Sequence, residues 1–217
     1  MIMPVEVDGM ILHAEETEAG MISQIFNGQE YGAVPWESLD SPIVIDIGAN
    51  IGAFACYAHS KSSSSRIHCF EPNPKSVELL VMNAPFATIH PVALGGMDCQ
   101  AMLRLNKAGS FADSFRVPMV ADPEGYQLVT IRDAGSVWDE VGLGVSNLVD
   151  VLKIDAEGCE VEILRSLGSR LVYVRFIQIE YHSELDRRMI DIMLHSFSLL
   201  ASFVHGPGLG VLTYRQF

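Results

Sequence analysis

The sequence predicts an α/β fold whose central strands run parallel and are buried on both faces. The first observation is a short β-branched run, Ile43–Ile47, which is apolar apart from one aspartate and lacks a polar alternation. The second is that such runs alternate with helical patterns, as in parallel crossover units. The third is that glycines and acidic residues directly follow the runs, for example Gly48 and Glu71. Ligands of open α/β sheets bind at those strand ends.

The first half of the alternation is well punctuated. In order, we expect strands at 43–47, 67–70 and 88–94 and helices at 51–58 and 74–83. Pro42 precedes the first strand and Gly48 ends it. Asn73 is placed to cap the second helix, and Pro74 occupies its first position, where the missing amide hydrogen costs nothing.

The second half resumes the alternation after an interruption at 97–135. Within that stretch, residues 100–105 and 127–132 alternate and predict antiparallel strands around a loop at 109–111. We then expect strands at 149–154 and 173–181, helices at 158–167 and 184–197, and a closing hairpin of 199–204 and 211–214. For the N-terminal part, the expectation is a strand pair followed by a helix at 19–26.

Length and punctuation favour one domain over residues 1–217. Residues 1–40 form an N-terminal extension of the alternating pattern, and residues 97–135 form an insertion within it. These two stretches are the material from which a substrate lid could be made.

The composition excludes several function classes. There are 14 Lys and Arg against 27 Asp and Glu, a net charge of −13, so we expect no nucleic-acid partner. No apolar run approaches the roughly 18 residues that cross a bilayer, and an acid at position 6 interrupts any signal-peptide core, so we expect no membrane association. The cysteines lack C-x-x-C spacing and are expected to be reduced thiols of a cytoplasmic protein: Cys56, Cys69, Cys99 and Cys159.

The loop after the first strand, 46–52, joins a strand to a helix through glycine. Gly48 permits a tight turn and a close approach of a ligand to the backbone, and the following helix points its free amides at the same place. The dinucleotide fingerprint G-x-G-x-x-G is not met, because Asn50 stands where the second glycine belongs. This disfavours an NAD-linked oxidoreductase, and a purely structural turn stays open.

Glu71 follows the second strand, 25 residues after Asp46. An acid at this position can accept hydrogen bonds from both hydroxyls of a ribose. The alternative is that its carboxylate simply complements the nearby helix N-terminus. Asn73 is expected to be a helix cap rather than a ligand contact.

Two later strands end in ionisable residues. Asp155 follows the strand at 149–154 and is placed to touch a ligand, whereas Glu160 is expected to complement the dipole of the next helix. Strand alternation puts Glu180 and His182 on one face of the strand at 173–181, so that His182 either faces a cleft or only enters a helix. If the two strands are neighbours, we predict an ion pair between Lys153 and Glu180.

Together these segments resemble the FkbM family of S-adenosylmethionine-dependent methyltransferases. The resemblance is carried by DIGANIG (46–52), FEPNP (70–74), VAL (92–94), KIDAEGCE (153–160) and IEYH (179–182). It implies the Rossmann-like class I methyltransferase fold, a seven-stranded, mostly parallel sheet with one antiparallel strand and helices on both faces. Residues 131–138 depart from the segment that the family usually carries before its fourth strand.

The resemblance also implies a site for S-adenosylmethionine. Its methionine part would lie near Asp46, Gly48 and Asn50, and Glu71 would hold the ribose hydroxyls. The full set of expected cofactor-binding residues is Asp46, Gly48, Asn50, Gly52, Glu71, Pro72, Asn73, Ala93 and Asp155.

Methyl transfer from a sulfonium needs orientation and, for an alcohol, a base that takes the hydroxyl proton. His182 is the first candidate for that base because of its ordinary pKa, followed by Asp155 and Glu157. The sequence has no compact metal-ligand motif, so we expect no metal. Asp155, Glu180 and His182 are the residues that could hold one.

The predicted function is therefore O-methylation of a small-molecule hydroxyl in a natural-product or glycan pathway. The alternatives are N-methylation of a small-molecule amine, an NAD-linked oxidoreductase and a cofactor-binding module without turnover. The identity of the acceptor and the oligomeric state, with a homodimer among the options, stay open.

Overall fold

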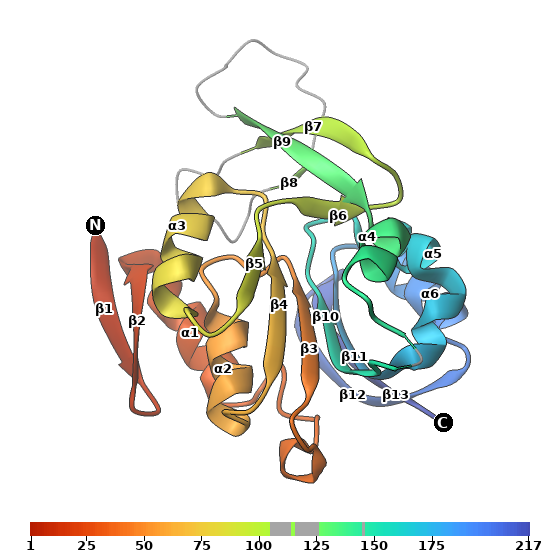
Figure 1. Ribbon diagram of the computed structural model, residues 1–217, viewed down its shortest axis with the longest axis horizontal. Coiled ribbons are helices and arrows are strands. Elements are labelled where there is room, and N and C mark those ends of the chain that lie inside the picture. The colour runs from red at the N-terminus through yellow and green to blue at the C-terminus, as the bar shows by residue number, and fades with distance from the viewer. Residues whose placement is uncertain (105–113, 116–125, 145) are drawn as a thin grey trace.

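A seven-stranded sheet forms the centre of the molecule in the computed structural model, which describes residues 1–104, 114–115, 126–144 and 146–217 (Figure 1). The strand order is β12-β13-β11-β10-β3-β4-β5. The strands are β3 (Ile43–Ile47), β4 (Arg66–Phe70), β5 (Thr88–His90), β10 (Val149–Ile154), β11 (Val174–Tyr181), β12 (Phe197–Gly206) and β13 (Leu209–Gln216). β13 runs antiparallel to both of its neighbours and the other pairings in this sheet are parallel, which confirms the mostly parallel seven-stranded sheet.

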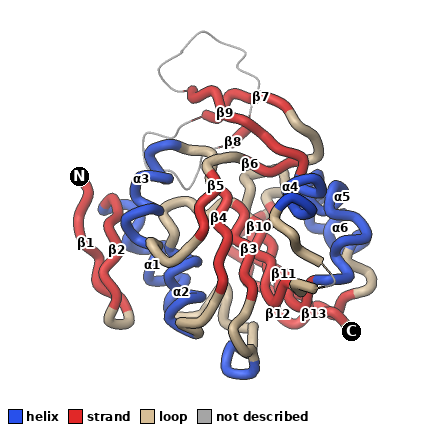
Figure 2. Tube along the Cα trace, viewed as in Figure 1, coloured by secondary structure: helices blue, strands red, loops and turns tan. Residues whose placement is uncertain are grey.

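Helices cover both faces of this sheet, as Figures 1 and 2 show. One face carries α1 (Ala19–Phe26), α2 (Ala53–Lys61) and α3 (Pro74–Asn83), and the other carries α4 (Ala134–Glu140), α5 (Glu160–Leu167) and α6 (Glu184–Met193). Each face has its own hydrophobic core. In β3, Ile43, Ile45 and Ile47 enter one core while Val44 enters the other, which explains why the strand is apolar without alternation.

The element boundaries agree with the sequence where glycine, proline or a cap marks them. α3 begins at Pro74, and the side chain of Asn73 accepts a hydrogen bond from the amide of Lys75 as predicted. The closing hairpin and the helix at 19–26 are also confirmed. The helix expected at 184–197 ends earlier, at Met193, because the chain turns there to enter β12.

The strand expected at 88–94 is wrong, because the chain divides there between two sheets. β5 ends at His90 and pairs with β4, whereas β6 (Ala93–Gly95) pairs with β9. Pro91 lies between them and has no amide hydrogen for a ladder, and the amide of Val92 turns back to the carbonyl of His90.

β6 belongs to a second, four-stranded sheet of order β6-β9-β7-β8. Its other strands are β7 (Cys99–Arg104), β8 (Ser114–Phe115) and β9 (Tyr126–Asp133). The antiparallel pairing of β7 with β9 confirms the two alternating strands predicted in the insertion, and the loop predicted at 109–111 lies outside the described residues. Helix α4, directly after β9, was not predicted.

The N-terminal extension forms a hairpin of β1 (Ile2–Val7) and β2 (Met10–Glu15) that leads into α1. The side chain of Asn83, at the end of α3, accepts a hydrogen bond from the amide of His13 and donates one to its carbonyl. This contact fastens the hairpin to the helix layer. Leu12 and Ala14 of β2 are fully buried in the same core as α1 and α2.

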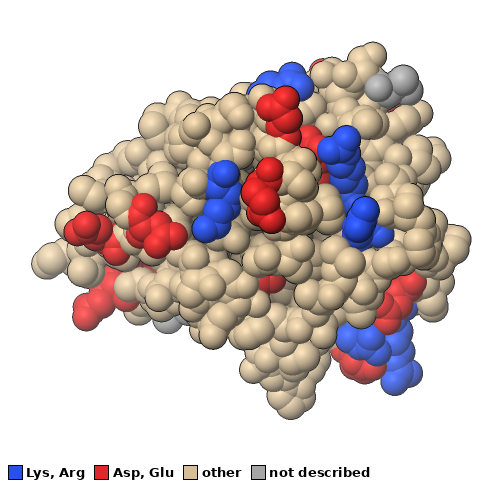
Figure 3. Space-filling model, turned by 90° about the horizontal axis from the view of Figure 1, so that it is seen from below, with Lys and Arg blue, Asp and Glu red and all other residues tan. Residues whose placement is uncertain are grey.

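Charged side chains of both signs are interspersed on the face that Figure 3 shows, so the net charge of −13 does not gather there into one acidic surface. Among the described residues, no helix combines the length and apolar character that a membrane crossing requires.

A buried lysine joins the two central strands, β3 and β10. Nζ of Lys153 lies 3.1 Å from Oδ1 of Asp46 and 3.4 Å from Oδ2 of Asp155, and it donates to the carbonyl of Gly48 at 2.6 Å. Asp46 is fully buried and Lys153 nearly so. The predicted ion pair between Lys153 and Glu180 is therefore wrong: among the described residues, Lys153 pairs with Asp46 and Asp155 instead.

The strand register explains this correction. β10 and β11 are indeed parallel neighbours, but Lys153 lies opposite Gln178 on one side and opposite Asp46 on the other. Two residues further along, this register brings Glu180 beside Asp155, and these two carboxyl groups share a hydrogen bond. The lysine is thus nearest to Asp46, the acid directly across from it.

Replacement of Lys153 by methionine should lower the free energy of unfolding by about 3–5 kcal/mol near neutral pH, because it leaves Asp46 buried without its cation. Burial raises the pKa of Asp46, so the folded state holds its proton more tightly than the unfolded state does. Stability of the variant then falls as the pH rises, and the loss should be larger near about pH 8 than near about pH 5. Urea unfolding at both pH values measures this.

The matched control is Arg175→Met, which removes a surface ion pair with Asp150 and should cost less than about 1 kcal/mol. Equal losses in the two variants would contradict a special role for the buried pair. The double variant Asp46→Asn/Lys153→Met should recover part of the loss, because neither partner is then left charged and alone.

Candidate active site

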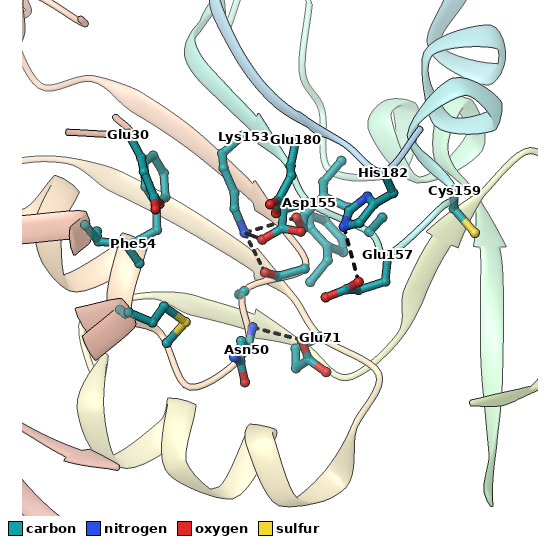
Figure 4. Close-up of a pocket in the computed structure, with 18 of the residues that line it drawn as sticks. Glu30, Asn50, Phe54, Glu71, Lys153, Asp155, Glu157, Cys159, Glu180 and His182 are labelled. Carbon is teal, nitrogen blue, oxygen red and sulfur yellow. Dashed lines mark hydrogen bonds and ion pairs between the residues drawn. The ribbon is translucent and has the colours of Figure 1, made fainter. Parts of the chain in front are cut away.

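A cavity of about 960 Å³ opens where β3, β4, β10 and β11 end. Parallel strands bring their carboxyl ends to one edge of a sheet, so the loops that follow these strands face one another across the cavity. Figure 4 draws 18 of the lining residues and labels ten of them. Cavity-lining residues that the sequence singled out are Gly48, Asn50, Glu71, Pro72, Ala93, Asp155, Glu157, Glu180 and His182.

The loop after β3 lies so close to the end of β10 that only glycine fits at position 48. Gly48 has φ +75°, and a Cβ on it would come within 1.7 Å of the carbonyl oxygen of Asp155. Asn50 also has a left-handed backbone, with φ +48°. These two left-handed residues turn the loop tightly and leave its backbone accessible to a ligand in the cavity, as the sequence predicted for Gly48.

Glu71 fastens this loop to the one after β4. Its Oε2 accepts a hydrogen bond from the amide of Asn50, and its Oε1 accepts one from the amide of Asn73, each at 2.8 Å. Figure 4 shows the carboxylate next to Asn50 at the lower side of the cavity. An acid so fixed presents acceptor oxygens to hydroxyl groups in the cavity.

Asp155 and Glu180 form a pair of carboxyl groups above the loop (Figure 4). Burial opposes the ionisation of Asp155, but Lys153 and the hydrogen bond from Glu180 outweigh it and lower the pKa of Asp155. Burial, the negative charge of Asp155 and the shared hydrogen bond raise the pKa of Glu180 to about 10. Asp155 is therefore ionised near pH 7, and Glu180 holds the proton between them.

His182 lies between two glutamates. Its Nε2 is 3.2 Å from Oε2 of Glu157, and its Nδ1 is 3.3 Å from Oε1 of Glu160. Burial disfavours the charged ring, but hydrogen bonds to the two carboxylates outweigh this and raise the pKa of His182 to about 11. Burial is also the main reason why the pKa of Glu157 is raised to about 7.

Glu160 does more than complement a helix dipole. Its carboxylate, 1% exposed, accepts hydrogen bonds from the amides of Ala156 and Gly158 and faces the ring of His182. The first-turn position in α5 is as expected, but the contact with His182 depends on how β11 lies against α5, which spacing in the sequence does not reveal.

One ligand atom each from Asp155, Glu157 and His182 lie within 4.8 Å of one another. Carboxylate oxygens and an imidazole nitrogen are suitable ligands for a divalent cation. Of the residues that the sequence offered for a metal, Asp155 and His182 belong to this group, and Glu157 takes the place of Glu180.

Three expected cofactor residues do not line the cavity. Asp46 lies beneath the cavity, in contact with the lining residue Lys153, and Asn73 caps α3. Gly52 precedes α2 with φ +88°, where a Cβ would meet the side chain of Leu80 at 2.7 Å. These residues support the site from behind rather than facing into it.

The sequence reading missed several contributors from outside the motifs, and three of them carry polar groups. Glu30 and Tyr31 come from the segment after α1, and His205 comes from the end of β12. The carbonyl of Tyr31 accepts a hydrogen bond from Gln178, which fastens this segment to β11. No local spacing marks these residues, because long-range packing alone brings them to the cavity.

Comparison with solved structures identifies the fold. The chain matches a precorrin-6y C5,15-methyltransferase from Geobacter metallireducens with a TM-score of 0.50 at 14% identity, covering 97% of this chain and 95% of the other. A tRNA (uracil-54, C5)-methyltransferase from Pyrococcus abyssi, solved with S-adenosyl-L-homocysteine, matches with a TM-score of 0.51 at 9% identity, covering 98% and 44%. The seven-stranded sheet is thus that of the class I methyltransferases.

Curated proteins show similar sequences. The chain is 27% identical over 170 residues to the hexuronic acid methyltransferase AglP of Haloferax volcanii, covering 75% of this chain and 65% of that protein. It is 26% identical over 188 residues to the 2-O-methyltransferase NoeI of Sinorhizobium fredii, covering 76% of each. The chain therefore spans slightly less than two thirds of the length of the first of these relatives.

The model of the methyltransferase FkbM domain matches residues 46–199, well over half of the chain. The matched range begins at the buried aspartate of β3 and contains the glycine loop, Glu71 and the group around His182. The chain belongs to the FkbM family of S-adenosylmethionine-dependent methyltransferases.

Proposed function

We propose that the chain transfers a methyl group from S-adenosylmethionine to a hydroxyl group of a small molecule. One observation carries this proposal: a single cavity joins the glycine loop and Glu71 on one side to an ionisable group, Glu157 with His182, on the other. The first part suits a nucleoside cofactor and the second suits a proton-transfer step. The names of the relatives AglP and NoeI, one of them a 2-O-methyltransferase, support oxygen as the acceptor atom.

The residues of the cavity fit the cofactor. Gly48 lets a ligand approach the backbone, and the fixed carboxylate of Glu71 offers oxygens to the ribose hydroxyls. Lys153 fixes the position of the loop through its contacts with Asp46, Asp155 and the carbonyl of Gly48. The same residues fit an NAD pyrophosphate poorly, because Asn50 carries a side chain where that site needs glycine.

The cofactor supplies an activated methyl group on a sulfonium, so the protein has to orient the acceptor and take its proton. Sequence reasoning favoured His182 as the base. The two glutamates around its ring favour the protonated imidazolium, and this supports Glu157 as the group that takes the acceptor proton, with His182 orienting its carboxylate. A pKa of about 7 suits Glu157 to that task near neutral pH.

Asp155 would stay ionised beside Glu157 and His182, and its negative charge would stabilise the positive sulfonium of the bound cofactor. N-methylation is the second candidate, because an unprotonated amine needs no base. The proton-accepting group in the cavity favours the hydroxyl acceptor over the amine.

The size of the cavity suits a small molecule beside the cofactor. We also infer that the protein works in the cytoplasm, where its four free thiols, Cys56, Cys69, Cys99 and Cys159, would stay reduced.

Replacement of Glu71 by glutamine should weaken binding of S-adenosylhomocysteine about 10- to 100-fold, because hydrogen bonds to a charged acceptor are worth roughly 1.5–3 kcal/mol. Isothermal titration calorimetry measures the change. Glu78→Gln, an exposed change on α3, is the matched control and should bind like the wild type. Equal dissociation constants for all three proteins would contradict the assignment of Glu71.

Replacement of Glu157 by glutamine should lower kcat about 10²–10⁴-fold and leave S-adenosylhomocysteine binding intact, because only the proton acceptor is lost. The assay follows radiolabelled methyl transfer to a small-molecule extract of the producing cells. Glu162→Gln, exposed on α5, serves as the control. A Glu157→Gln protein with the wild-type rate would remove Glu157 from the mechanism.

A further inference from the structure

Two segments outside the family-matched residues 46–199 meet at the cavity. Glu30 comes from the N-terminal extension, and His205 comes from the C-terminal hairpin. Nε2 of His205 lies 3.4 Å from Oε1 of Glu30 and 3.9 Å from Oε1 of Glu180. These three residues, from three separate parts of the chain, form one polar cluster in the cavity wall, here called the Glu30 cluster.

The Glu30 cluster lies away from the expected cofactor loop. In Figure 4, Glu30 and Glu180 lie on the upper side of the cavity, whereas Asn50 and Glu71 lie on the lower side. The side chain of Glu30 is only 8% exposed, and the ring of Phe203 packs edge-on against His205 with centroids 5.0 Å apart. Glu30 is therefore enclosed in the cavity wall, whereas His205 lies at its solvent-exposed edge.

Among the described residues that line the cavity, no lysine or arginine is free to compensate these acids, and protonated His182 lies between Glu157 and Glu160. Lys153 is the only Lys or Arg among the described residues that line the cavity, and its amine already contacts Asp46, Asp155 and the carbonyl of Gly48. Burial, with the charge of Asp155 adding to it, raises the pKa of Glu30 to about 7. Near pH 7 Asp155 is ionised and Glu30 is partly ionised, so a carboxylate or phosphate arriving here would meet negative charge at close range.

The cluster offers what hydroxyl groups need. Carboxylate oxygens accept hydrogen bonds from hydroxyls. Burial lowers the pKa of His205, so its ring is neutral near pH 7 and has one nitrogen that donates and one that accepts. The rings of Tyr31 and Phe54 contact each other, also line the cavity and offer an apolar surface to the carbon skeleton of a ligand.

We propose that Glu30, Glu180 and His205 form a subsite that binds hydroxyl groups of the methyl acceptor, and that it selects a hydroxyl-rich, uncharged acceptor over one with a carboxylate or phosphate. This inference rests on the proposed methyltransferase function. Because Glu30 and Glu180 lie across the cavity from Asn50 and Glu71, we assign the subsite to the acceptor rather than to the cofactor.

The test measures methyl transfer from radiolabelled S-adenosylmethionine to defined sugars. The neutral probes are the methyl glycosides of glucose, galactose, mannose and rhamnose, and the charged probes are methyl glucuronide and glucose 6-phosphate. For at least one neutral probe, kcat/KM should exceed that of every charged probe by about tenfold or more.

Variants locate the effect in the cluster. Glu30→Gln and His205→Ala should each raise KM for the neutral acceptor about tenfold, with the dissociation constant of S-adenosylhomocysteine changed by less than about twofold. Glu30→Lys should shift the ratio of kcat/KM for methyl glucuronide over methyl glucoside upward about tenfold or more. Glu37→Gln and His195→Ala, both exposed and outside the cavity, are the controls.

Equal or better use of the charged sugars by the wild type would overturn the subsite, and so would an unchanged KM in both Glu30→Gln and His205→Ala. A protein that binds S-adenosylhomocysteine but methylates no neutral glycoside also overturns the subsite, while the proposed function stands. A protein that does not bind the cofactor analogue contradicts the proposed function itself, which separates the two failures.

Discussion

The ion pair between Lys153 and Asp46 is the interaction on which the site depends. It is buried between the two central strands, and the same amine reaches the carbonyl of Gly48 and the carboxylate of Asp155. A single cation thus sets the distance between the end of β3 and the end of β10. The backbone of the glycine loop and the first ionisable residue of the cavity are fixed relative to each other by this contact, and every other group of the site is arranged around them.

Negative charge in the cavity is balanced by Lys153, by protonated His182 and by a proton shared between carboxyl groups. Lys153 keeps Asp155 ionised, Glu180 holds a proton against Asp155, and His182 lies between Glu157 and Glu160. Neighbouring acids are thereby driven to different protonation states by their surroundings, and this is a common way for one site to contain both an acid and a base. The acidity of the whole sequence is in this respect partly a property of the site.

The sequence was sufficient for the parts of the molecule that local rules determine. Strand β3 follows from its β-branched run, α3 from its cap and proline, and the strand-end positions of Glu71 and Asp155 from the crossover pattern. The sequence was insufficient where the pairing of strands determines which residues meet. The partner of Lys153 depends on the strand register, which places Gln178 rather than Glu180 opposite it. The break at Pro91 depends on pairing with a second sheet, which local propensity does not reveal. Glu30 and His205 came to the cavity through contacts between distant segments, which no spacing within a motif encodes.

At Pro91 the chain leaves the main sheet, which positions the cofactor loop, and enters a second sheet, which forms part of the cavity wall. One proline ends the edge of the main sheet and sends the chain into a second sheet, whose first strand supplies Ala93 and Leu94 to the cavity wall. The second sheet contacts the cavity through these residues and Leu103 but contributes nothing to the ladder between β3 and β10. The second sheet is nevertheless tied to the main core, because Leu94 packs with residues of α4 and α5. A change in β7 or β9 can therefore reach the cavity wall through Leu103 or β6 while the ladder between β3 and β10 keeps the cofactor loop in position.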